Sequence, residues 1–341
     1  MRALVLDQIG HLEIQDRPDP SPAAGEVVIR VSATGICGSD VHGYTGENGR
    51  RVPGQIMGHE SAGTIAAVGE GATAFAVGDT VTFNPVVVPA ADLPEFAGRE
   101  QMSPRKRVIG VDPTWDSSFA ELVIVPERNV VALDAAMPIE FGALIEPLAV
   151  AVHAVRRAGV TPGQRALVVG GGPIGQSVVL ALTMAGASTI VVSEVDDERR
   201  ALVEQLGAES VDAGSADAVE NAQRIAGGPF DVAIDAVGIE PTLATALSAT
   251  AIGATICLVG MGSPRVSIDA FQISTQERTL VGSFTYGSDD FRDAAEWIGT
   301  QGDIAKALIS EQVPMSAGPD AFERLAHGTP TPGKIIVRLD R

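Results

Sequence analysis

Residues 165–176, RALVVGGGPIGQ, form a short apolar run that ends in closely spaced glycines. A continuous apolar run such as ALVVG is typical of a buried strand in a parallel sheet. The residues that follow, QSVVLALTMAGA, predict a helix. Gly170, Gly172 and Gly175 therefore match the GxGxxG turn at the place where it binds phosphates, between a strand and a helix.

This turn predicts a dinucleotide site. Gly170 permits the tight turn, Gly172 lets the backbone approach a pyrophosphate, and Gly175 lets the helix pack closely on the strand. The N–H groups at the helix start, around Pro173 and Ile174, would then face the phosphates. Without a ligand, the same pattern is a tight connection between a strand and a helix.

An acidic residue at the end of the next strand sharpens the prediction. Glu194 ends the apolar run TIVVSE and lies 19 residues beyond Gly175. Its carboxylate would accept hydrogen bonds from both hydroxyls of the adenosine ribose and would repel a 2′-phosphate, which favours NAD over NADP. Arg199 and Arg200 follow closely, and either arginine could hold that phosphate instead.

The fingerprint lies within a repeating pattern of strands and helices. That alternation predicts an α/β fold with a doubly wound parallel sheet over residues 153–287. Residues 1–152 instead carry short alternating strands with glycines at their corners, which predicts a small β-barrel or curled sheet. Residues 288–341 end in the strand-like KIIVRL and are expected to complete the first domain.

A second chemical motif spans residues 35–60, GICGSDVHGYTGENGRRVPGQIMGHE. Cys37, His59 and Glu60 offer a thiolate, an imidazole and a carboxylate, the ligand types of a catalytic zinc site that keeps one position open. Ser39 and His42 lie between them and could carry a proton to solvent. The alternative is a cysteine buried in a turn, two surface histidines and an ordinary acid.

Composition limits the function classes. The 341 residues carry a net charge of −19, which disfavours nucleic acid and anionic membrane surfaces as partners. No apolar run reaches the roughly 18 residues that a membrane span needs, and the N-terminus lacks the pattern of a secretory signal. Two cysteines make no disulfide framework, so we expect a cytoplasmic protein.

Several motifs together resemble the zinc-dependent medium-chain dehydrogenases. They are GICGSDVHGYTG, GHESAGTI, VGEGATAFAVGDTV, SFAELVIVP, LIEPLAVAVHAV and VVGGGPIGQ. The chain is most similar to the polyol branch, which includes sorbitol and threonine dehydrogenases. The resemblance covers almost the whole chain, and it implies a GroES-like β-barrel catalytic domain together with a Rossmann domain.

The resemblance also implies roles for individual residues. Cys37 and His59 would bind the catalytic zinc. Glu60 and Glu146 would supply a carboxylate contact, directly or through water. Asp40 matches the family acid that orients the zinc-bound histidine.

Three departures from the family pattern affect these expectations. Residues 84–111 contain no cysteine, so the structural zinc of many relatives is expected to be absent. Gly43 and Thr285 replace an aromatic residue and an arginine that are common in sorbitol dehydrogenases, so the resemblance does not single out sorbitol as the substrate. Cys257, in TICLVG, is expected to be a core residue.

The predicted activity is reversible oxidation of a secondary alcohol to a ketone with NAD, where zinc polarises the alcohol. Ser39 would take the first proton and His42 would relay it outward. An L-threonine or vicinal-diol dehydrogenase remains an alternative. More distant alternatives are a zinc-independent quinone or enoyl reductase and a non-catalytic nucleotide-binding relative. The family resemblance implies a homodimer or homotetramer.

Overall fold

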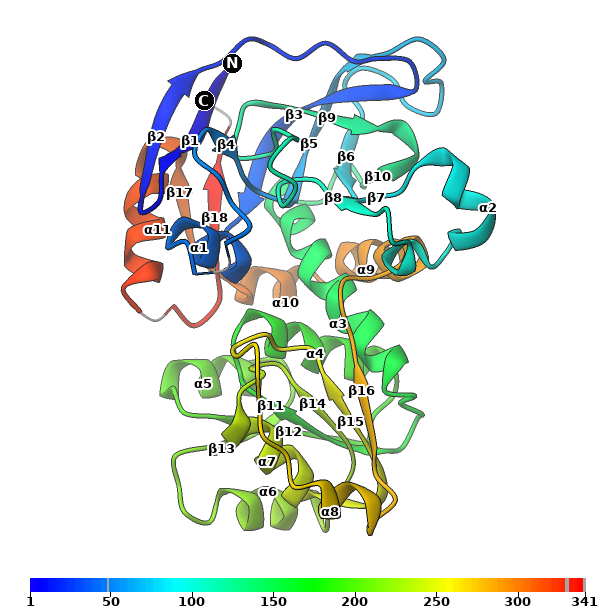
Figure 1. The fold of residues 1–341 in the computed structure, drawn as a ribbon, viewed down its shortest axis with the longest axis vertical. Coiled ribbons are helices and arrows are strands. Elements are labelled where there is room, and N and C mark those ends of the chain that lie inside the picture. The colour runs from blue at the N-terminus through cyan, green and yellow to red at the C-terminus, as the bar shows by residue number, and fades with distance from the viewer. Residues whose placement is uncertain (48, 329–330, 340–341) are drawn as a thin grey trace. The chain divides into compact units, whose positions relative to one another are not determined.

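The computed structural model describes residues 1–47, 49–328 and 331–339, and the chain forms two compact units (Figure 1). Unit 1 comprises Met1–Glu146 and Tyr286–Arg341, and unit 2 comprises Pro147–Thr285. The sequence predicts domain boundaries at 152/153 and 287/288, whereas the compact units divide at 146/147 and 285/286.

A mixed sheet forms the centre of unit 1. Its neighbouring strands are antiparallel except for the last two, which are parallel. In spatial order the strands are β10 (Val130–Ala132), β6 (Thr80–Phe83), β5 (Glu60–Val68), β3 (Glu26–Gly35), β18 (Lys334–Arg338) and β17 (Ile309–Pro314), and β9 (Leu122–Pro126) also pairs with β3. The closing strand of the chain therefore lies beside a strand from its beginning.

The register of this sheet brings the end of β3 and the start of β5 together beside β18. Gly35, at the end of β3, lies opposite Glu60, at the start of β5. Gly35 also pairs with Ile336 of β18. Residues that flank these three positions therefore meet at one edge, although they come from distant parts of the sequence.

Smaller elements surround this sheet. β2 (His11–Asp16), β1 (Arg2–Gln8) and β4 (Gln55–Ile56) form one small sheet, and β7 (Val86–Val87) and β8 (Arg107–Val108) form another. The helices are α1 (Gly38–Tyr44), α2 (Leu93–Phe96), α9 (Ser288–Gly299), α10 (Gly302–Ala307) and α11 (Gly318–Ala326). The short 3₁₀ segments are η1 (Ala90–Asp92), η2 (Glu100–Met102), η3 (Glu127–Asn129), η4 (Ile139–Leu144) and η5 (Met315–Ala317).

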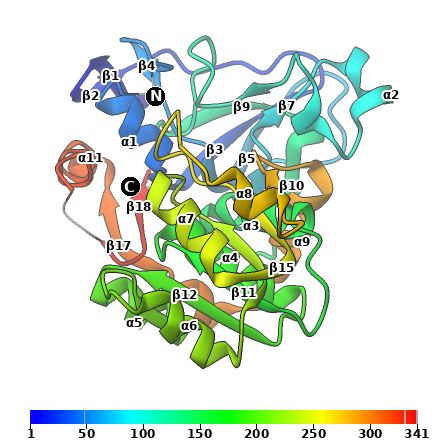
Figure 2. The same ribbon diagram turned by 60° about the horizontal axis from the view of Figure 1, so that its bottom comes forward.

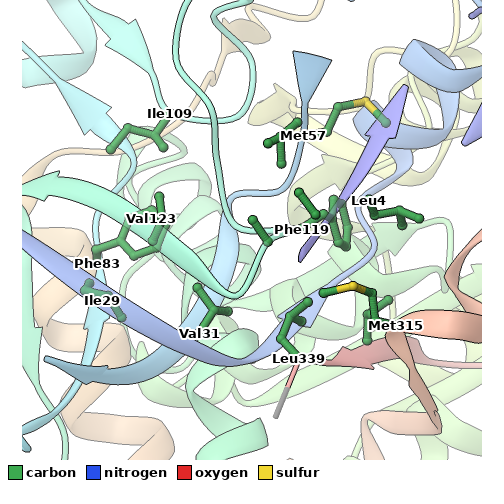
Figure 3. Packing of buried hydrophobic residues seen from close by; sticks show 14 of the residues in the cluster. Leu4, Ile29, Val31, Met57, Phe83, Ile109, Phe119, Val123, Met315 and Leu339 are labelled. Carbon is green, nitrogen blue, oxygen red and sulfur yellow. The ribbon is translucent and has the colours of Figure 1, made fainter. Parts of the chain in front are cut away.

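The core of unit 1 is built from buried strand residues and aromatic rings, among them Phe83 and Phe119 (Figure 3). Phe119 lies near Leu4 and Met57, and its backbone carbonyl and N–H form hydrogen bonds with the backbones of Leu4 and Met57, respectively. The Phe119 ring meets Phe322 of α11 edge-on, with centroids 5.3 Å apart. Burying a side chain of this size stabilises the fold by about 1.5–3 kcal/mol, so these contacts hold α11 against the opening strands.

Unit 2 is a parallel sheet with helices, which confirms the predicted fold class. Its strands, in spatial order, are β13 (Glu209–Asp212), β12 (Thr189–Glu194), β11 (Arg165–Val169), β14 (Phe230–Asp235), β15 (Thr250–Leu258) and β16 (Thr279–Gly282). Every neighbouring pair is parallel. This is the doubly wound order, and its switch point lies between β11 and β14.

The helices of unit 2 are α3 (Ile145–Arg157, which begins in unit 1), α4 (Pro173–Met184), α5 (Asp197–Gln205), α6 (Ala218–Ala226), α7 (Glu240–Ala249) and α8 (Ala270–Ser274). Figure 2 shows α5 and α6 beside the β12 end of the sheet. Cys257 is fully buried in β15, as the sequence predicts. No helix within the described part of the chain has the length and apolar character to cross a membrane.

Candidate metal and cofactor sites

The strand ends of unit 1 gather the metal-ligand types that the sequence predicts. Cys37 is the N-cap of α1, Glu60 is the first residue of β5, and His59 directly precedes that strand. One ligand atom from each residue lies within 4.8 Å of the other two. Among the described residues, this is the one cluster of three or more such ligands. His59 and Glu60 are buried, whereas Cys37 is partly exposed.

Two observations show that these residues fit a zinc ion. The donor set of thiolate, imidazole and carboxylate is one that catalytic zinc uses. In addition, Glu60 Oε2 is buried and has no hydrogen-bond partner among the described residues. A buried acceptor without a partner costs about 1–3 kcal/mol, and a metal ion would satisfy it.

Asp40 faces the other side of the His59 ring. Its Oδ1 lies 3.5 Å from His59 Nδ1 and accepts a hydrogen bond from Arg51 Nη2 at 3.3 Å. Its Oδ2 accepts a hydrogen bond from the Cys37 backbone N–H at 3.3 Å. Burial alone would raise the pKa of Asp40, but His59 and Arg51 outweigh it and lower the pKa below its usual value. Because the charged carboxylate faces Nδ1, Nε2 is the ring nitrogen available to a metal.

The structure explains why glycine stands at position 43. A Cβ on Gly43 would lie 2.2 Å from Cγ of Arg51. The stem of Arg51 thus occupies the space beside α1 that a side chain at this position would need. A side chain at this position would therefore displace Arg51, which contacts Asp40.

Glu146 lies near this group but is not part of it. It is in the first turn of α3, and its Oε1 accepts a hydrogen bond from the Tyr286 hydroxyl at 2.8 Å. Burial raises the pKa of Glu146 to about 7, His59 opposes the shift, and Glu60 adds to it. Burial and Glu146 together raise the pKa of Tyr286 well above its usual value, so the phenol remains a donor.

The sequence analysis missed three residues around the metal group: Arg51, Tyr286 and Lys334. Lys334 opens β18, and its Nζ donates to Glu60 Oε1 at 2.7 Å and to the Ile36 carbonyl at 3.4 Å. Burial would lower the pKa of Lys334, but Glu60 and Cys37 outweigh it and raise the pKa. The available signal was a lysine directly before the apolar run IIV in KIIVRL.

Ser39 and His42 lie on α1, one helical turn apart. Ser39 is half-buried and His42 is exposed, with its Nε2 4.0 Å from Glu47 Oε2. The two side chains therefore lead from the partly covered start of the helix toward solvent.

In unit 2, the glycine-rich turn has the predicted position between β11 and α4. Gly170 has φ +96°, which is a left-handed conformation. A Cβ on Gly175 would lie 1.8 Å from the Gly170 carbonyl oxygen. Only glycine can occupy this position without moving the turn, and the helix start is held beside the strand end.

Glu194 lies beside this turn. Its Oε2 accepts the Gly171 N–H at 2.6 Å, and its Oε1 accepts the N–H groups of Val195 and Asp196 at 2.7 and 2.9 Å. A carboxylate has about four acceptor sites, so Glu194 orders the turn and retains capacity for a ligand hydroxyl.

The two arginines after Glu194 differ. Arg200 Nη1 donates to the Glu194 carbonyl at 2.8 Å, and its Nη2 pairs with Asp197. Arg199 instead reaches the glycine-rich turn, where its Nη1 lies 3.9 Å from the position of a Cβ on Gly172. Arg199 is therefore the arginine placed beside the predicted phosphate site.

The lobe of residues 84–111 is closed by polar contacts. Ser103 Oγ donates to Asp92 Oδ2 at 2.7 Å, and the Arg105 guanidinium pairs with the same carboxylate. The carboxylate of Glu100 accepts the Ser288 N–H at 3.0 Å and so binds the start of α9. These contacts link the two sides of the lobe without cysteines.

Comparison with known proteins gives the family. Residues 23–135 match the Alcohol dehydrogenase GroES-like domain, and residues 173–300 match the Zinc-binding dehydrogenase family. The chain is 33% identical to D-xylulose reductase A of Aspergillus niger over 337 residues, which cover 96% of this chain and 94% of the relative.

Two solved structures are similar over nearly the full length. The first is 2R,3R-butanediol dehydrogenase from Bacillus subtilis, with a TM-score of 0.89, 30% identity and 99% coverage of both chains. The second is a zinc-binding dehydrogenase from Sinorhizobium meliloti bound to NADP, with a TM-score of 0.89, 28% identity, and 99% and 98% coverage. The chain belongs to the zinc-dependent medium-chain dehydrogenases, in their polyol dehydrogenase branch, and is an alcohol dehydrogenase-type enzyme that uses a nicotinamide cofactor.

Proposed function

We propose that this enzyme reversibly oxidises a secondary alcohol of a polyol, sugar or vicinal diol to a ketone, with zinc held by Cys37, His59 and Glu60. The observation that carries the proposal is the clustering of these three ligand types around a buried carboxylate oxygen without a partner. The relatives named for D-xylulose and 2R,3R-butanediol support this substrate class. Zinc in this position would polarise the alcohol oxygen as a Lewis acid.

The residues of the chain would orient the site and move the proton. Asp40 fixes the His59 ring by facing Nδ1. Ser39 would accept the proton of the alcohol, and His42 would pass it to solvent, because the two lie one turn apart and differ in exposure. Glu146 would stay close to the metal, held through Oε1 by Tyr286.

For the cofactor, we propose NAD rather than NADP. Glu194 ends β12 beside the glycine-rich turn, where its charge would oppose a 2′-phosphate. Arg200 is directed to Glu194 and Asp197 instead of toward a phosphate. The S. meliloti neighbour was solved with NADP, so the preference depends on these residues of this chain, with Arg199 as the group that could weaken it.

We also propose one zinc per chain, because the lobe of residues 84–111 has no cysteine and is closed by Asp92, Ser103 and Arg105.

For assembly, we propose a homodimer or homotetramer. β16 is an edge strand of the unit 2 sheet. Near it, large apolar side chains are exposed, among them Ile252 (75%), Phe271 (77%) and Leu280 (36%). An exposed apolar edge strand readily pairs with another chain.

The test of the activity is a substrate panel. The zinc-loaded protein is assayed for formation of reduced nicotinamide with pentitols, hexitols, vicinal diols and L-threonine, each with NAD and with NADP. We expect turnover of a polyol or diol with NAD, and loss of that turnover after removal of zinc. Turnover restricted to L-threonine, or reduction of quinones or enoyl compounds without zinc, would replace the proposal with one of its alternatives.

A further inference from the structure

A buried lysine contacts the carboxylate at the centre of the metal group. The Lys334 side chain is 5% exposed and that of Glu60 is fully buried. Lysine is almost never fully buried unless it is paired, and here Nζ lies 2.7 Å from Glu60 Oε1. The ion pair between Lys334 and Glu60 is therefore part of the metal site.

The backbone fixes where this lysine can reach. β18 lies beside β3, and the Ile36 N–H donates to the Ile335 carbonyl at 3.0 Å. Lys334 also donates to the Ile36 carbonyl, one residue before Cys37. Its ammonium is thus held against the loop that carries the first metal ligand.

The two oxygens of Glu60 have different surroundings. Oε1 is taken by Lys334, whereas Oε2 is buried without a partner. A Cβ at position 35 would lie 2.3 Å from Oε2, so the glycine at the end of β3 leaves the space that this oxygen occupies. One oxygen is held by the protein and the other remains available to a metal.

We infer that Lys334 is a positioning residue that keeps Glu60 bound to zinc through a single oxygen, so that one coordination position stays open for the alcohol. This inference rests on the proposed zinc site. A catalytic zinc needs that open position, and a carboxylate released from Lys334 can offer both oxygens. Because a neighbouring cation repels the metal, Lys334 also weakens metal binding.

The metal affinity after removal of Lys334 distinguishes this role from a purely structural one. Removing a buried cation whose only task is packing would loosen the strand ends, and the metal would bind more weakly. If Lys334 competes with the metal for Glu60, its removal makes the metal bind more tightly.

The experiment uses the full-length protein with Co²⁺ in place of zinc. Lys334→Met removes the charge at similar length, and Lys334→Arg keeps it. As a control, Lys306→Met removes the charge of an exposed lysine on α10. For each protein, the visible d–d absorption reports the coordination number, and competition with a chelator gives the affinity.

We expect Lys334→Met to bind Co²⁺ at least about tenfold more tightly, within the range by which groups around metal ligands alter affinity. We also expect weaker d–d absorption, since more ligands surround the metal. Lys334→Arg and Lys306→Met should keep the wild-type spectrum. In a Glu60→Gln background, Lys334→Met should leave the spectrum unchanged, because the effect acts through Glu60.

An unchanged spectrum in Lys334→Met would overturn the inference even if binding became tighter, because the loss of charge repulsion alone tightens binding without changing the coordination number. Weaker metal binding in Lys334→Met would also overturn it. If Lys334→Met does not fold, Lys334→Gln replaces it with the same expectations. Titration of the wild-type protein with metal distinguishes a failure of the proposed zinc site from a failure of the role inferred for Lys334. A wild-type protein that binds no metal refutes the proposed zinc site, whereas one that binds a single equivalent while Lys334→Met behaves identically refutes only the role of Lys334.

Discussion

At the scale of single residues, each acidic side chain around the metal group is paired with a side chain of its own. Arg51 binds Asp40, Lys334 binds Glu60 and Tyr286 binds Glu146. Such partners fix the direction of a ligand and tune the metal that it binds. The electrostatics of the site therefore depend on residues that are not themselves metal ligands.

The first prediction at this scale concerns Cys37. Cys37→Ser removes the softest donor, so we expect zinc affinity to fall by more than the about 10–100-fold caused by changes around metal ligands. Metal analysis after dialysis measures the loss, and reduced-cofactor fluorescence should show that unit 2 still binds nicotinamide. Cys257→Ser, in the core of β15, is the control and should keep its zinc. Full zinc content in Cys37→Ser would remove this residue from the site.

The second prediction concerns Glu194. Glu194→Ser should narrow or reverse the ratio of kcat/KM for NAD and NADP, because the repulsion removed is on the order of 1–4 kcal/mol at short range. KM for both cofactors should also rise, since Glu194 holds the Gly171 N–H. Glu198→Ser changes an exposed acid of α5 and should leave the ratio unaltered. A wild-type preference for NADP would make Arg199 the deciding residue.

The sequence predicts only part of this site. Cys37, His59 and Glu60 lie close together in the sequence, and the glycine-rich turn and Glu194 follow a known spacing, so both groups could be found. Lys334 reaches Glu60 across a separation of 274 residues, and Tyr286 reaches Glu146 across 140. Such pairs depend on strand register and chain crossings, which periodicity does not reveal.

At the scale of elements, most strands agree with the predicted pattern, whereas one helix boundary differs for a clear reason. The run FGALIEPLAVAVHAVRRAG, residues 141–159, predicts a helix that ends at Gly159. The α-helix instead begins at Ile145, after the 3₁₀ segment η4. Pro147 lacks an N–H and is tolerated only in the first turn of a helix, so the helix begins just before it. The helices α10 and α11 were not predicted, because each is only one to three turns long and gives little periodic signal.

The prediction at this scale concerns the lobe of residues 84–111. Asp92→Ala leaves Ser103 and Arg105 without their shared acceptor, so we expect the free energy of unfolding to fall by about 1–3 kcal/mol. Urea denaturation measures this change, and metal analysis should still give one zinc per chain. Arg107→Met, which breaks a more exposed pair with Asp112, is the control and should have little effect. Two zinc ions per wild-type chain would show a second metal site.

At the scale of the whole molecule, metal and cofactor chemistry are divided between the two compact units. The metal group lies entirely in unit 1, and the glycine-rich turn and Glu194 lie in unit 2. The hydrogen bond between Tyr286 and Glu146 joins the two points where the chain leaves unit 1. Changes in one site should therefore leave the fold of the other intact.

The assembly prediction belongs to this scale. Leu280→Lys places a charge on the edge strand β16, which is a change that blocks edge pairing. Light scattering after size exclusion should show a smaller species than the wild-type homodimer or homotetramer. Ile225→Lys, on an exposed position of α6, is the matched control. A monomeric wild-type protein, or an unchanged mass in Leu280→Lys, would refute this interface.

The most direct test of the central claim follows the hydrogen that is transferred. A polyol or diol substrate deuterated at the reacting carbon is oxidised with NAD, and the reduced cofactor is analysed by mass spectrometry. We predict that each reduced cofactor carries the deuterium of the substrate, that none is gained from D₂O with unlabelled substrate, and that the transfer stops in Cys37→Ser. Reduced cofactor without substrate deuterium, or undiminished transfer in Cys37→Ser, would contradict zinc-dependent hydride transfer by this enzyme.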